Sequence, residues 1–138
     1  MLHMLDTDTT SYLIKGRSPA IEAKLAALPP AMVCISVMTR AELLYGLKRL
    51  PPEHPLHLAV HQFLKIARIL PWDEDAADFY ADIRHQLVST GQPIGEIDMM
   101  IAAHSLSAGA ILVTNNLRHF QRITAPLMLT NWSEIDRD

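Results

Sequence analysis

Short apolar runs alternate with helix-like patterns along this chain of 138 residues. Each run has the β-branched or continuous apolar character of a buried strand and is too short for a helix. Residues typical of turns or helix starts follow most of them. The five strand segments are contained in residues 3–10, 32–37, 67–72, 110–113 and 126–132.

Helical patterns occupy the intervals between these runs. Asp8, Thr9 and Thr10 form a cluster typical of a helix start, and Ser18 before Pro19 is typical of an N-cap followed by a first-turn proline. The predicted helices lie within residues 11–16, 18–28, 38–50, 55–68, 73–91 and 97–106, with one or two further turns in 117–123. Alternating strands and helices predict a parallel sheet with right-handed crossovers. We therefore expect one α/β domain, residues 1–138, with about five strands and helices on both faces.

Residues 94–116 have the most unusual pattern in the chain. Apolar residues surround the predicted helix 97–106 on all sides, which is typical of a buried helix. Asp98 lies in its first turn, where a buried charge is costly unless a partner or a metal ion compensates it. The strand that follows delivers Thr114 and Asn116 to its C-terminal end. Ligands bind at that edge in open α/β sheets.

Four acid or amide side chains are predicted to meet at this edge: Asp6, Glu42, Asp98 and Asn116. Asp6 ends the first strand, with Asp8 two residues further on, and Glu42 lies in the helix after the second strand. Oxygen ligands of this kind suit Mg²⁺, which keeps several waters for the substrate. Such an ion can activate water and stabilise a phosphoryl transition state. The set therefore predicts a divalent-metal site.

Each of these residues also has a structural interpretation when it is taken alone. Asp6 could cap a helix, although the cluster that follows it already serves that purpose. Glu42 could be a solvated helix residue, Asp98 could cap its helix, and Asn116 is typical of a helix N-cap. His104 is expected in the core and His119 at the surface. The site hypothesis therefore depends on the set of four.

Composition sets limits on location and partners. A hydrophobic content of 49% and a charged content of 20% are typical of a globular protein, and no apolar run approaches the roughly 20 residues of a membrane span. The N-terminal segment lacks the basic region of a signal peptide, and the single cysteine, Cys34, cannot form an internal disulfide. We therefore expect a cytoplasmic protein. The net charge of −3 does not exclude RNA binding, because a bound cation compensates an acidic site.

Four segments of the chain together resemble the PIN-domain ribonucleases, and among them the VapC-like toxins of bacterial toxin–antitoxin pairs. The segments are LDTDTTSYL, ISVMTRAELLYGL, GEIDMMIAAHSLSAGAILVTNNLRHF and LTNW. The third is the most specific, since D-x-x-I-A-A-H is followed by V-T-N-N. The order and spacing of all four match the family over nearly the whole chain.

The resemblance implies a three-layer α/β/α fold and an endoribonuclease that depends on Mg²⁺ or Mn²⁺. It implies that Asp6, Glu42 and Asp98 are acidic metal ligands and that Thr114 orients the site. The family's fourth acidic position falls on Asn116, whose carbonyl oxygen can bind a metal but brings no charge. The resemblance also implies an RNA substrate, a homodimer and a cognate antitoxin.

Two other classes of function remain open from the residues. Asp6 and Asp8 also fit D-x-D-x-T, the motif of haloacid-dehalogenase-like phosphatases, in which the first Asp is a nucleophile and the second a general acid. That family also needs a placed lysine and acids at the end of a strand, whereas Asp98 follows STGQPIG, which is no strand. The second alternative is a non-catalytic binding module, in which Asn116 marks a degraded site.

Basic residues near the predicted edge are candidates for phosphate contacts. Arg40 and Arg118 are the candidates for contacts with RNA. Alternatively, they are ordinary solvated surface charges. Further basic residues in the same regions are Lys48, Arg49 and Arg122. In the predicted helix 38–50, the apolar residues at 43–45 and 47 exceed one core-facing stripe, which favours a dimer.

Overall fold

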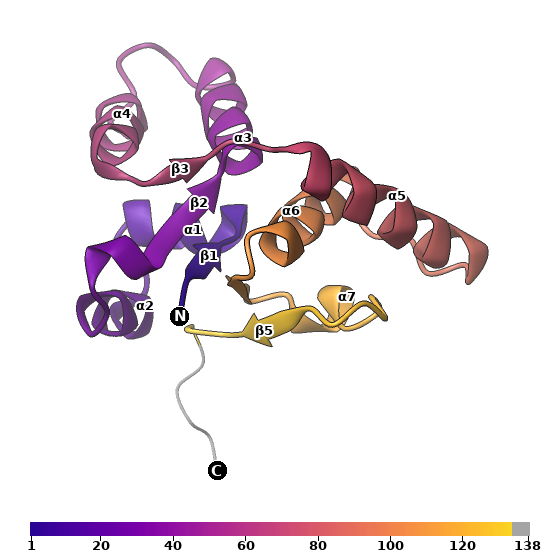
Figure 1. The fold of residues 1–138 in the computed structure, drawn as a ribbon. Helices are drawn as coiled ribbons and strands as arrows, with labels where there is room; N and C mark the ends of the chain where they lie inside the picture. Colours follow the sequence, from indigo (N-terminus) through magenta and orange to yellow (C-terminus); the bar gives the residue numbers. More distant parts are fainter. Residues whose placement is uncertain (134–138) are drawn as a thin grey trace.

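Five short parallel strands form one sheet in the computed structural model, which describes residues 1–133 (Figure 1). The strands are β1 (His3–Leu5), β2 (Val33–Ser36), β3 (Ile69–Leu70), β4 (Ile111–Val113) and β5 (Met128–Thr130). Their order in the sheet is β3-β2-β1-β4-β5. This confirms the expected parallel α/β fold of about five strands. Residues 134–138 of the predicted domain lie outside the described residues.

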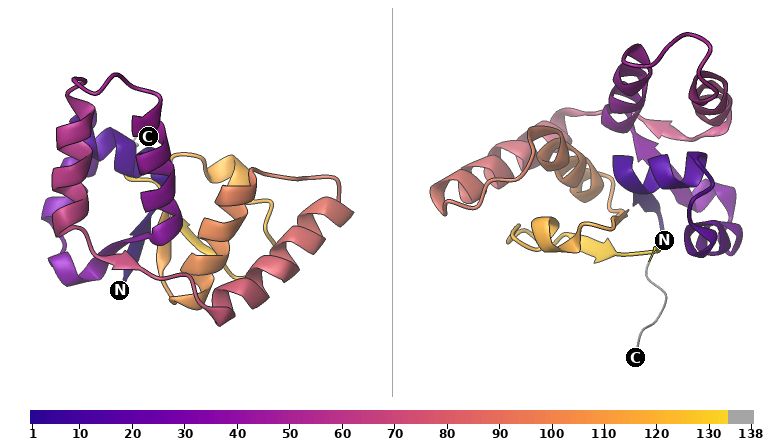
Figure 2. Two further views of the ribbon diagram at one scale, coloured as in Figure 1. Left: turned by 90° about the horizontal axis from the view of Figure 1, so that it is seen from above. Right: turned by 180° about the vertical axis from the view of Figure 1, so that it is seen from behind.

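Seven α-helices connect the strands of the described chain, and their positions follow the predicted order. They are α1 (Thr7–Ile14), α2 (Pro19–Ala26), α3 (Val37–Lys48), α4 (Leu56–Ile66), α5 (Glu74–Ser89), α6 (Glu96–Ser107) and α7 (Leu117–Phe120). A short 3₁₀ turn, η1 (Pro30–Met32), precedes β2. Figure 2 shows α1 to α4 gathered on one side of the molecule and α5 and α6 on the other. No helix in residues 1–133 is long and apolar enough to cross a membrane.

Successive strand residues pack against opposite faces of the sheet, as the period of two in a strand requires. In β1, Met4 belongs to the apolar cluster beneath α5 and α6, and the next residue, Leu5, belongs to the cluster beneath α1 to α4. Leu112 and Val113 of β4 divide in the same way. The three-layer arrangement follows, because each face of the sheet buries its own apolar side chains.

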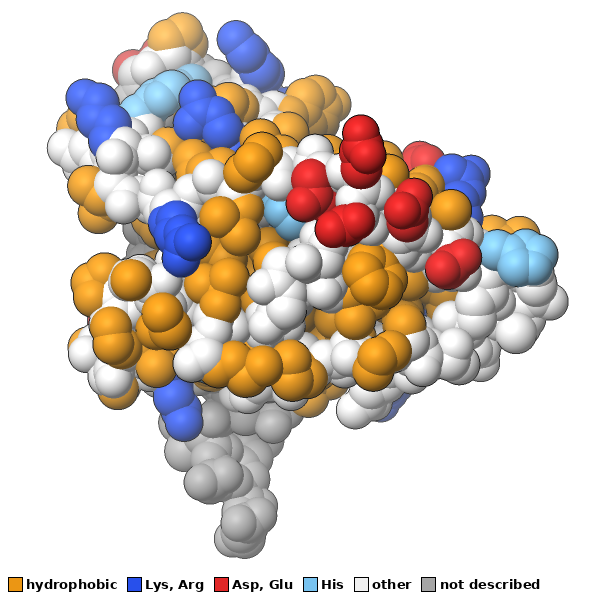
Figure 3. All heavy atoms as spheres, in the orientation of Figure 1, with side chains coloured by type: hydrophobic (Ala, Val, Ile, Leu, Met, Phe, Trp, Pro, Cys, Tyr) orange, Lys and Arg blue, Asp and Glu red, His pale blue; other side chains and the backbone are white. Residues whose placement is uncertain are grey.

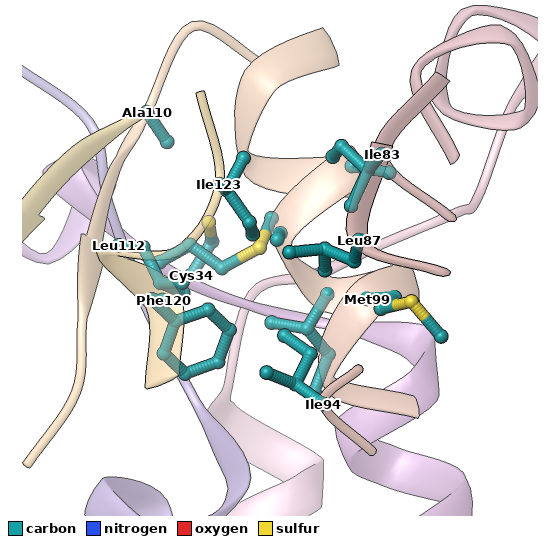
Figure 4. Packing of buried hydrophobic residues seen from close by; sticks show 13 residues of the cluster. Cys34, Ile83, Leu87, Ile94, Met99, Ala110, Leu112, Phe120 and Ile123 are labelled. Carbon is teal, nitrogen blue, oxygen red and sulfur yellow. The ribbon is translucent and has the colours of Figure 1, made fainter. Parts of the chain in front are cut away.

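The cluster under α5 and α6 encloses the buried helix that the sequence singles out. Ile101 is fully buried in α6, and Leu87 of α5 and Phe120 of α7 pack into the same cluster (Figure 4). Burying a side chain of this size contributes roughly 1.5–3 kcal/mol. The rigid packing holds the first turn of α6, and therefore Asp98, at the end of the sheet.

The start of the first helix differs from the prediction. The sequence suggested a helix start at Asp8 to Thr10, but α1 already begins at Thr7, with Asp6 as its N-cap. The Asp6 carboxylate accepts a hydrogen bond from the backbone N–H of Thr9 at 2.8 Å. Asp8 therefore does not replace Asp6 as the cap, because the chain turns into the helix directly from β1. The strand predicted at 32–37 likewise ends at Ser36, whose side chain caps α3.

Candidate functional site

A cavity of about 180 Å³ lies at the C-terminal edge of β1 and β4. We call it the acid cavity, and its lining residues are Asp6, Thr7, Asp8, Glu42, Asp98, Asn116 and Phe120. The four residues predicted from the sequence to meet at this edge are therefore brought together. They come from the end of β1, the middle of α3, the first turn of α6 and the segment after β4.

Asp6 is the most deeply buried carboxylate of the acid cavity, with 4% of its surface exposed. Burial raises its pKa, while hydrogen bonds from the Thr114 hydroxyl and from the backbone and side chain of Thr9 act in the opposite direction. The nearby charge of Asp8 raises the pKa further. Burial dominates, so an uncompensated negative charge on Asp6 is unfavourable here.

Thr114 connects two of the converging residues. It is fully buried, its hydroxyl hydrogen-bonds to Asp6, and its Oγ1 accepts the backbone N–H of Asn116 at 2.9 Å. A single hydroxyl can donate one bond and accept another, so both contacts are compatible. The end of β1 and the turn after β4 are thereby held in a defined relation.

Thr7 restrains Glu42, a contact that the sequence analysis missed. The Thr7 hydroxyl donates to Glu42 Oε1 at 2.5 Å, and its oxygen lies 3.2 Å from the hydroxyl of the buried Thr39. Thr7 and Glu42 are 35 positions apart in the chain. The one local signal for Thr7 was its position directly after Asp6, a predicted site residue.

Asp98 shows that the carboxylates act on one another. Its pKa is raised to about 6, first by burial and then by the charges of Asp6, Glu42 and Asp8. Gly95 lies close below it, since a Cβ on Gly95 would stand 3.4 Å from Asp98 Oδ2. Glycine at this helix start therefore leaves room for the carboxylate.

A separate group of acids lies over the start of α5, where Figure 3 shows red side chains together on the surface. Asp73 is the N-cap of α5, and Glu74 and Asp75 occupy its first turn, where negative charge is favourable. None of these exposed side chains is among the causes of the raised pKa of Asp98. The two acidic groups are therefore electrostatically distinct.

Asn116 does not cap a helix with its side chain, contrary to the structural alternative. It occupies the N-cap position of α7 without a side-chain cap bond, and its Nδ2 lies 2.7 Å from His119 Nδ1. An amide nitrogen only donates, so His119 Nδ1 accepts and the Asn116 carbonyl oxygen stays available at the acid cavity. His119, which was expected at the surface, is half-buried, and its ring is hydrogen-bonded to Asn116.

The donors of the acid cavity suit a hard divalent cation. Carboxylate and amide oxygens line it, and Mg²⁺ and related ions prefer such ligands together with water. No three His, Cys, Asp or Glu side chains within residues 1–133 already stand close enough to bind one ion. Uncompensated carboxylates repel one another, and the raised pKa of Asp98 records that repulsion. The oxygen donors of the acid cavity therefore fit a divalent cation. We expect the carboxylates to move closer together when such an ion binds.

The remaining predicted residues occupy the surroundings of this cavity. Asp8 is exposed at its wall, Arg40 is half-buried on α3, and Arg118 lines an adjoining cavity next to Asn116. Arg49 lines a larger cavity of about 510 Å³, which shares Thr7, Asp8 and Glu42 with the acid cavity. Arg118 and Arg49 therefore line cavities that share a residue with the proposed site, Asn116 and Glu42 respectively, and Arg40 lines neither of them.

His104 is a core residue, as predicted. Its ring is 2% exposed, and Nδ1 lies 2.7 Å from Ser36 Oγ at the end of β2. Burial lowers its pKa, which favours the neutral ring. The contact joins α6 to the residue that caps α3, and these two helices carry Asp98 and Glu42.

Comparisons with known proteins give a consistent result. The PIN domain family model matches residues 3–126. The "tRNA(fMet)-specific endonuclease VapC" of Salmonella typhimurium is 39% identical over 130 residues, covering 94% of this chain and 96% of that protein. "Ribonuclease VapC2" of Haemophilus influenzae is also 39% identical, covering 94% and 97%. A chain in the crystal structure of DNA-bound VapBC from Salmonella typhimurium has a TM-score of 0.87 at 35% identity, covering 96% and 99%.

Proposed function

The chain belongs to the PIN-domain family, and from this premise we propose that it is a metal-dependent endoribonuclease, the toxin of a toxin–antitoxin pair. Relatives of nearly equal length are named as VapC ribonucleases, and the similar structures include VapBC complexes. The observation that carries the proposal is the convergence of Asp6, Glu42, Asp98 and Asn116 on one cavity. The family match favours this function over the phosphatase and the binding module.

We assign the metal-binding role to these four residues. Asp6, Glu42 and Asp98 supply negative charge, and Asn116 supplies a neutral carbonyl oxygen. Thr7 and Thr114 keep Glu42 and Asp6 in place through the hydrogen bonds described above. Burial and the charges of Asp6, Glu42 and Asp8 raise the pKa of Asp98, and a cation bound here would compensate these charges, so the same carboxylates that repel one another favour its binding.

A divalent ion, when bound, supplies positive charge for the phosphate oxygens and makes water a better nucleophile. The chain's own contribution is to hold the carboxylates on one side of the phosphodiester and to limit access of bulk water. Phe120, which is 1% exposed, forms the apolar part of the cavity wall. Electrostatic interactions strengthen beside such a wall. Arg40 is assigned to a contact with an RNA phosphate, and Arg118, which lines the cavity next to Asn116, to a contact with the RNA.

We propose Mg²⁺ or Mn²⁺ as the ion, because both match an all-oxygen set of donors. Nothing in the donor set selects between them, so the experiment includes both. RNA is the substrate class, and the two relatives named for tRNA(fMet) make that molecule a suitable first substrate. The protein is expected to act in the cytoplasm, where such RNA is found.

The decisive experiment measures cleavage of RNA by the purified chain in chelator and after addition of Mg²⁺ or Mn²⁺. Cleavage is expected to stop in chelator and to return with either ion. An Asp6→Asn preparation, purified in parallel, controls for contaminating nucleases and is expected to be inactive under every condition. Cleavage that persists undiminished in chelator, and is absent from the control, would falsify the metal-dependent mechanism.

The partners proposed for the chain are a cognate antitoxin and a second copy of itself. The similar structures include VapBC complexes, among them VapBC2 from Rickettsia felis bound to a DNA fragment from their promoter, with a TM-score of 0.86 at 30% identity. Tyr45 on α3 is 66% exposed, and Leu58 and Ile66 on α4 are 66% and 86% exposed. Exposed apolar side chains of this size are typical of surfaces that another chain covers. Light scattering of the isolated chain measures its oligomeric state, and a monomer at micromolar concentration would contradict the dimer.

A further inference from the structure

A second cavity, of about 450 Å³, adjoins the acid cavity. Asn116 lines both of them. The other lining residues come from the segment after β4, from α7 and from the end of β5: Asn115, Leu117, Arg118, His119 and Asn131. Among the described residues that line it, none is a carboxylate. Its charge therefore differs in sign from that of the acid cavity, since Arg118 is its cation.

Hydrogen-bond accounting shows which groups this cavity offers to a ligand. Asn116 Nδ2 donates to His119 Nδ1 at 2.7 Å, so the neutral ring carries its proton on Nε2. The Asn131 carbonyl oxygen already accepts from the backbone N–H and the hydroxyl of Ser133, at 2.8 and 2.6 Å. Its amide N–H groups remain as donors. Arg118 is exposed and has five N–H donors and no acceptor.

Asn115 brings one carbonyl acceptor and one amide NH₂ group. Donors therefore predominate on this surface, which we call the donor cavity. We propose that the donor cavity binds the nucleotide next to the scissile phosphate, an inference that rests on the proposed ribonuclease function. A nucleotide adjoining a phosphate in the acid cavity must occupy a neighbouring space, and the donor cavity is contiguous with it through Asn116. The larger cavity at Arg49 also adjoins the acid cavity, but Asp8 and Glu42 line it, so the cavity without carboxylates is the better match for a nucleotide. Proteins recognise single-stranded RNA by hydrogen bonds to the edges of unstacked bases.

The chemistry of the donors specifies the class of base. Guanine offers the acceptors O6 and N7, and uracil, like thymine, offers O4, whereas adenine and cytosine present amino groups at the corresponding position. N–H donors can bind the keto oxygens of guanine and uracil. The amino group of adenine or cytosine is itself a donor, so it would face another donor and make no hydrogen bond. Arg118 is suited to guanine because a guanidinium can bind O6 and N7 together. The donor cavity therefore selects guanine or uracil.

The experiment maps the ends of a randomised single-stranded RNA after cleavage by the full chain. The wild type is expected to cut next to guanine or uracil. Arg118→Gln and Asn131→Ala are expected to raise KM by roughly tenfold and to reduce that preference, since one good base contact provides discrimination of this order. Lys24→Gln, at an exposed lysine on α2, is the control for removal of a positive charge and is expected to retain the wild-type preference.

Calorimetric titration with Mn²⁺ separates this inference from the proposed function. Arg118→Gln and Asn131→Ala are expected to bind Mn²⁺ as the wild type does, and thermal melts confirm that both variants are folded. A wild type that cleaves RNA without preference for keto bases overturns the inference and leaves the ribonuclease intact. The inference is also overturned if both variants keep the wild-type preference and KM. A wild type that cleaves no RNA with either ion overturns both the inference and the proposed function.

Discussion

The acid cavity and the donor cavity share Asn116 but have opposite chemistry. The first is lined by four carboxylates from three separate helices or their caps and repels anions until a cation compensates it. The second has Arg118 as its charged group and hydrogen-bond donors around it. One is therefore suited to a cation and the other to an anionic, acceptor-rich nucleotide.

The difference explains why a neutral amide is acceptable at the boundary. Asn116 has two functional groups, and the structure uses them on different sides: the Nδ2 group donates to His119, and the carbonyl oxygen remains for the acid cavity. A carboxylate in the same place would add a fifth negative charge beside Asp6, Glu42, Asp8 and Asp98. It would also lack the N–H group that donates a hydrogen bond to His119 Nδ1. Three predictions test this division, in order of decreasing expected effect.

The largest effect is expected from removing a carboxylate of the acid cavity. Asp6→Asn keeps a side chain that can cap α1 but loses the charge, so kcat is expected to fall at least 100-fold, roughly 3 kcal/mol in the transition state. RNA affinity is expected to remain, because the donor cavity is unchanged. Steady-state cleavage and an RNA-binding titration measure the two quantities.

Asp82→Asn, at an exposed position on α5, is the matched control for this substitution. It is expected to cleave RNA at the wild-type rate, since Asp82 does not line the acid cavity. If Asp6→Asn retained most of its activity, or if both variants lost it equally, the assignment of catalysis to the acid cavity would be wrong.

A smaller effect is expected from making the boundary residue acidic. At about 4 Å and an effective dielectric near 20, two unit charges interact by roughly 4 kcal/mol, and repulsion from the existing carboxylates offsets most of that gain. Asn116→Asp is therefore expected to tighten Mn²⁺ binding by several-fold while cleavage is kept or enhanced. Calorimetric titration of both forms measures the change. Equal affinities would remove Asn116 from the metal site.

The smallest effect concerns the stability of the protein without metal. The pKa of Asp98 is about 6 in the folded state, above its ordinary value of about 3.9, so folding favours the protonated form. The stabilisation that comes from protonated Asp98 is fully present below about pH 3.9 and is lost as the pH rises through about 6. In chelator, Asp98→Asn is expected to melt a few degrees above the wild type at pH 7.5 and at nearly the same temperature at pH 4.

Saturating Mn²⁺ provides the control for this comparison, because it stabilises the wild type and is expected to reverse the order of the two melting temperatures at pH 7.5. Asp78→Asn, at an exposed site on α5, is expected to show no such dependence. A large loss of stability in Asp98→Asn at both pH values would mean that the carboxylate is a structural cap of α6.

The sequence alone determined the elements of this fold and the edge at which the polar residues meet. Period and composition are local properties, so five strands and the helices between them could be predicted to within a few residues. The C-terminal ends of parallel strands lie at one edge of a sheet, and residues such as Asp6 and Asn116 could be placed there without knowledge of the strand order. The buried helix around Asp98 was predictable because apolar residues surround it.

Only the tertiary structure decided how the polar side chains pair. Thr7 and Glu42 are distant in sequence, and their hydrogen bond exists because α1 and α3 pack side by side. The choice of Asn116 between capping α7 and pairing with His119 depends on the direction of one side chain, which both local patterns allow. The donor cavity needs Asn131, which lines it together with Asn115 only because β5 pairs with β4. Hydrogen bonds have strict geometry, and that geometry is set by packing between distant segments rather than by local sequence.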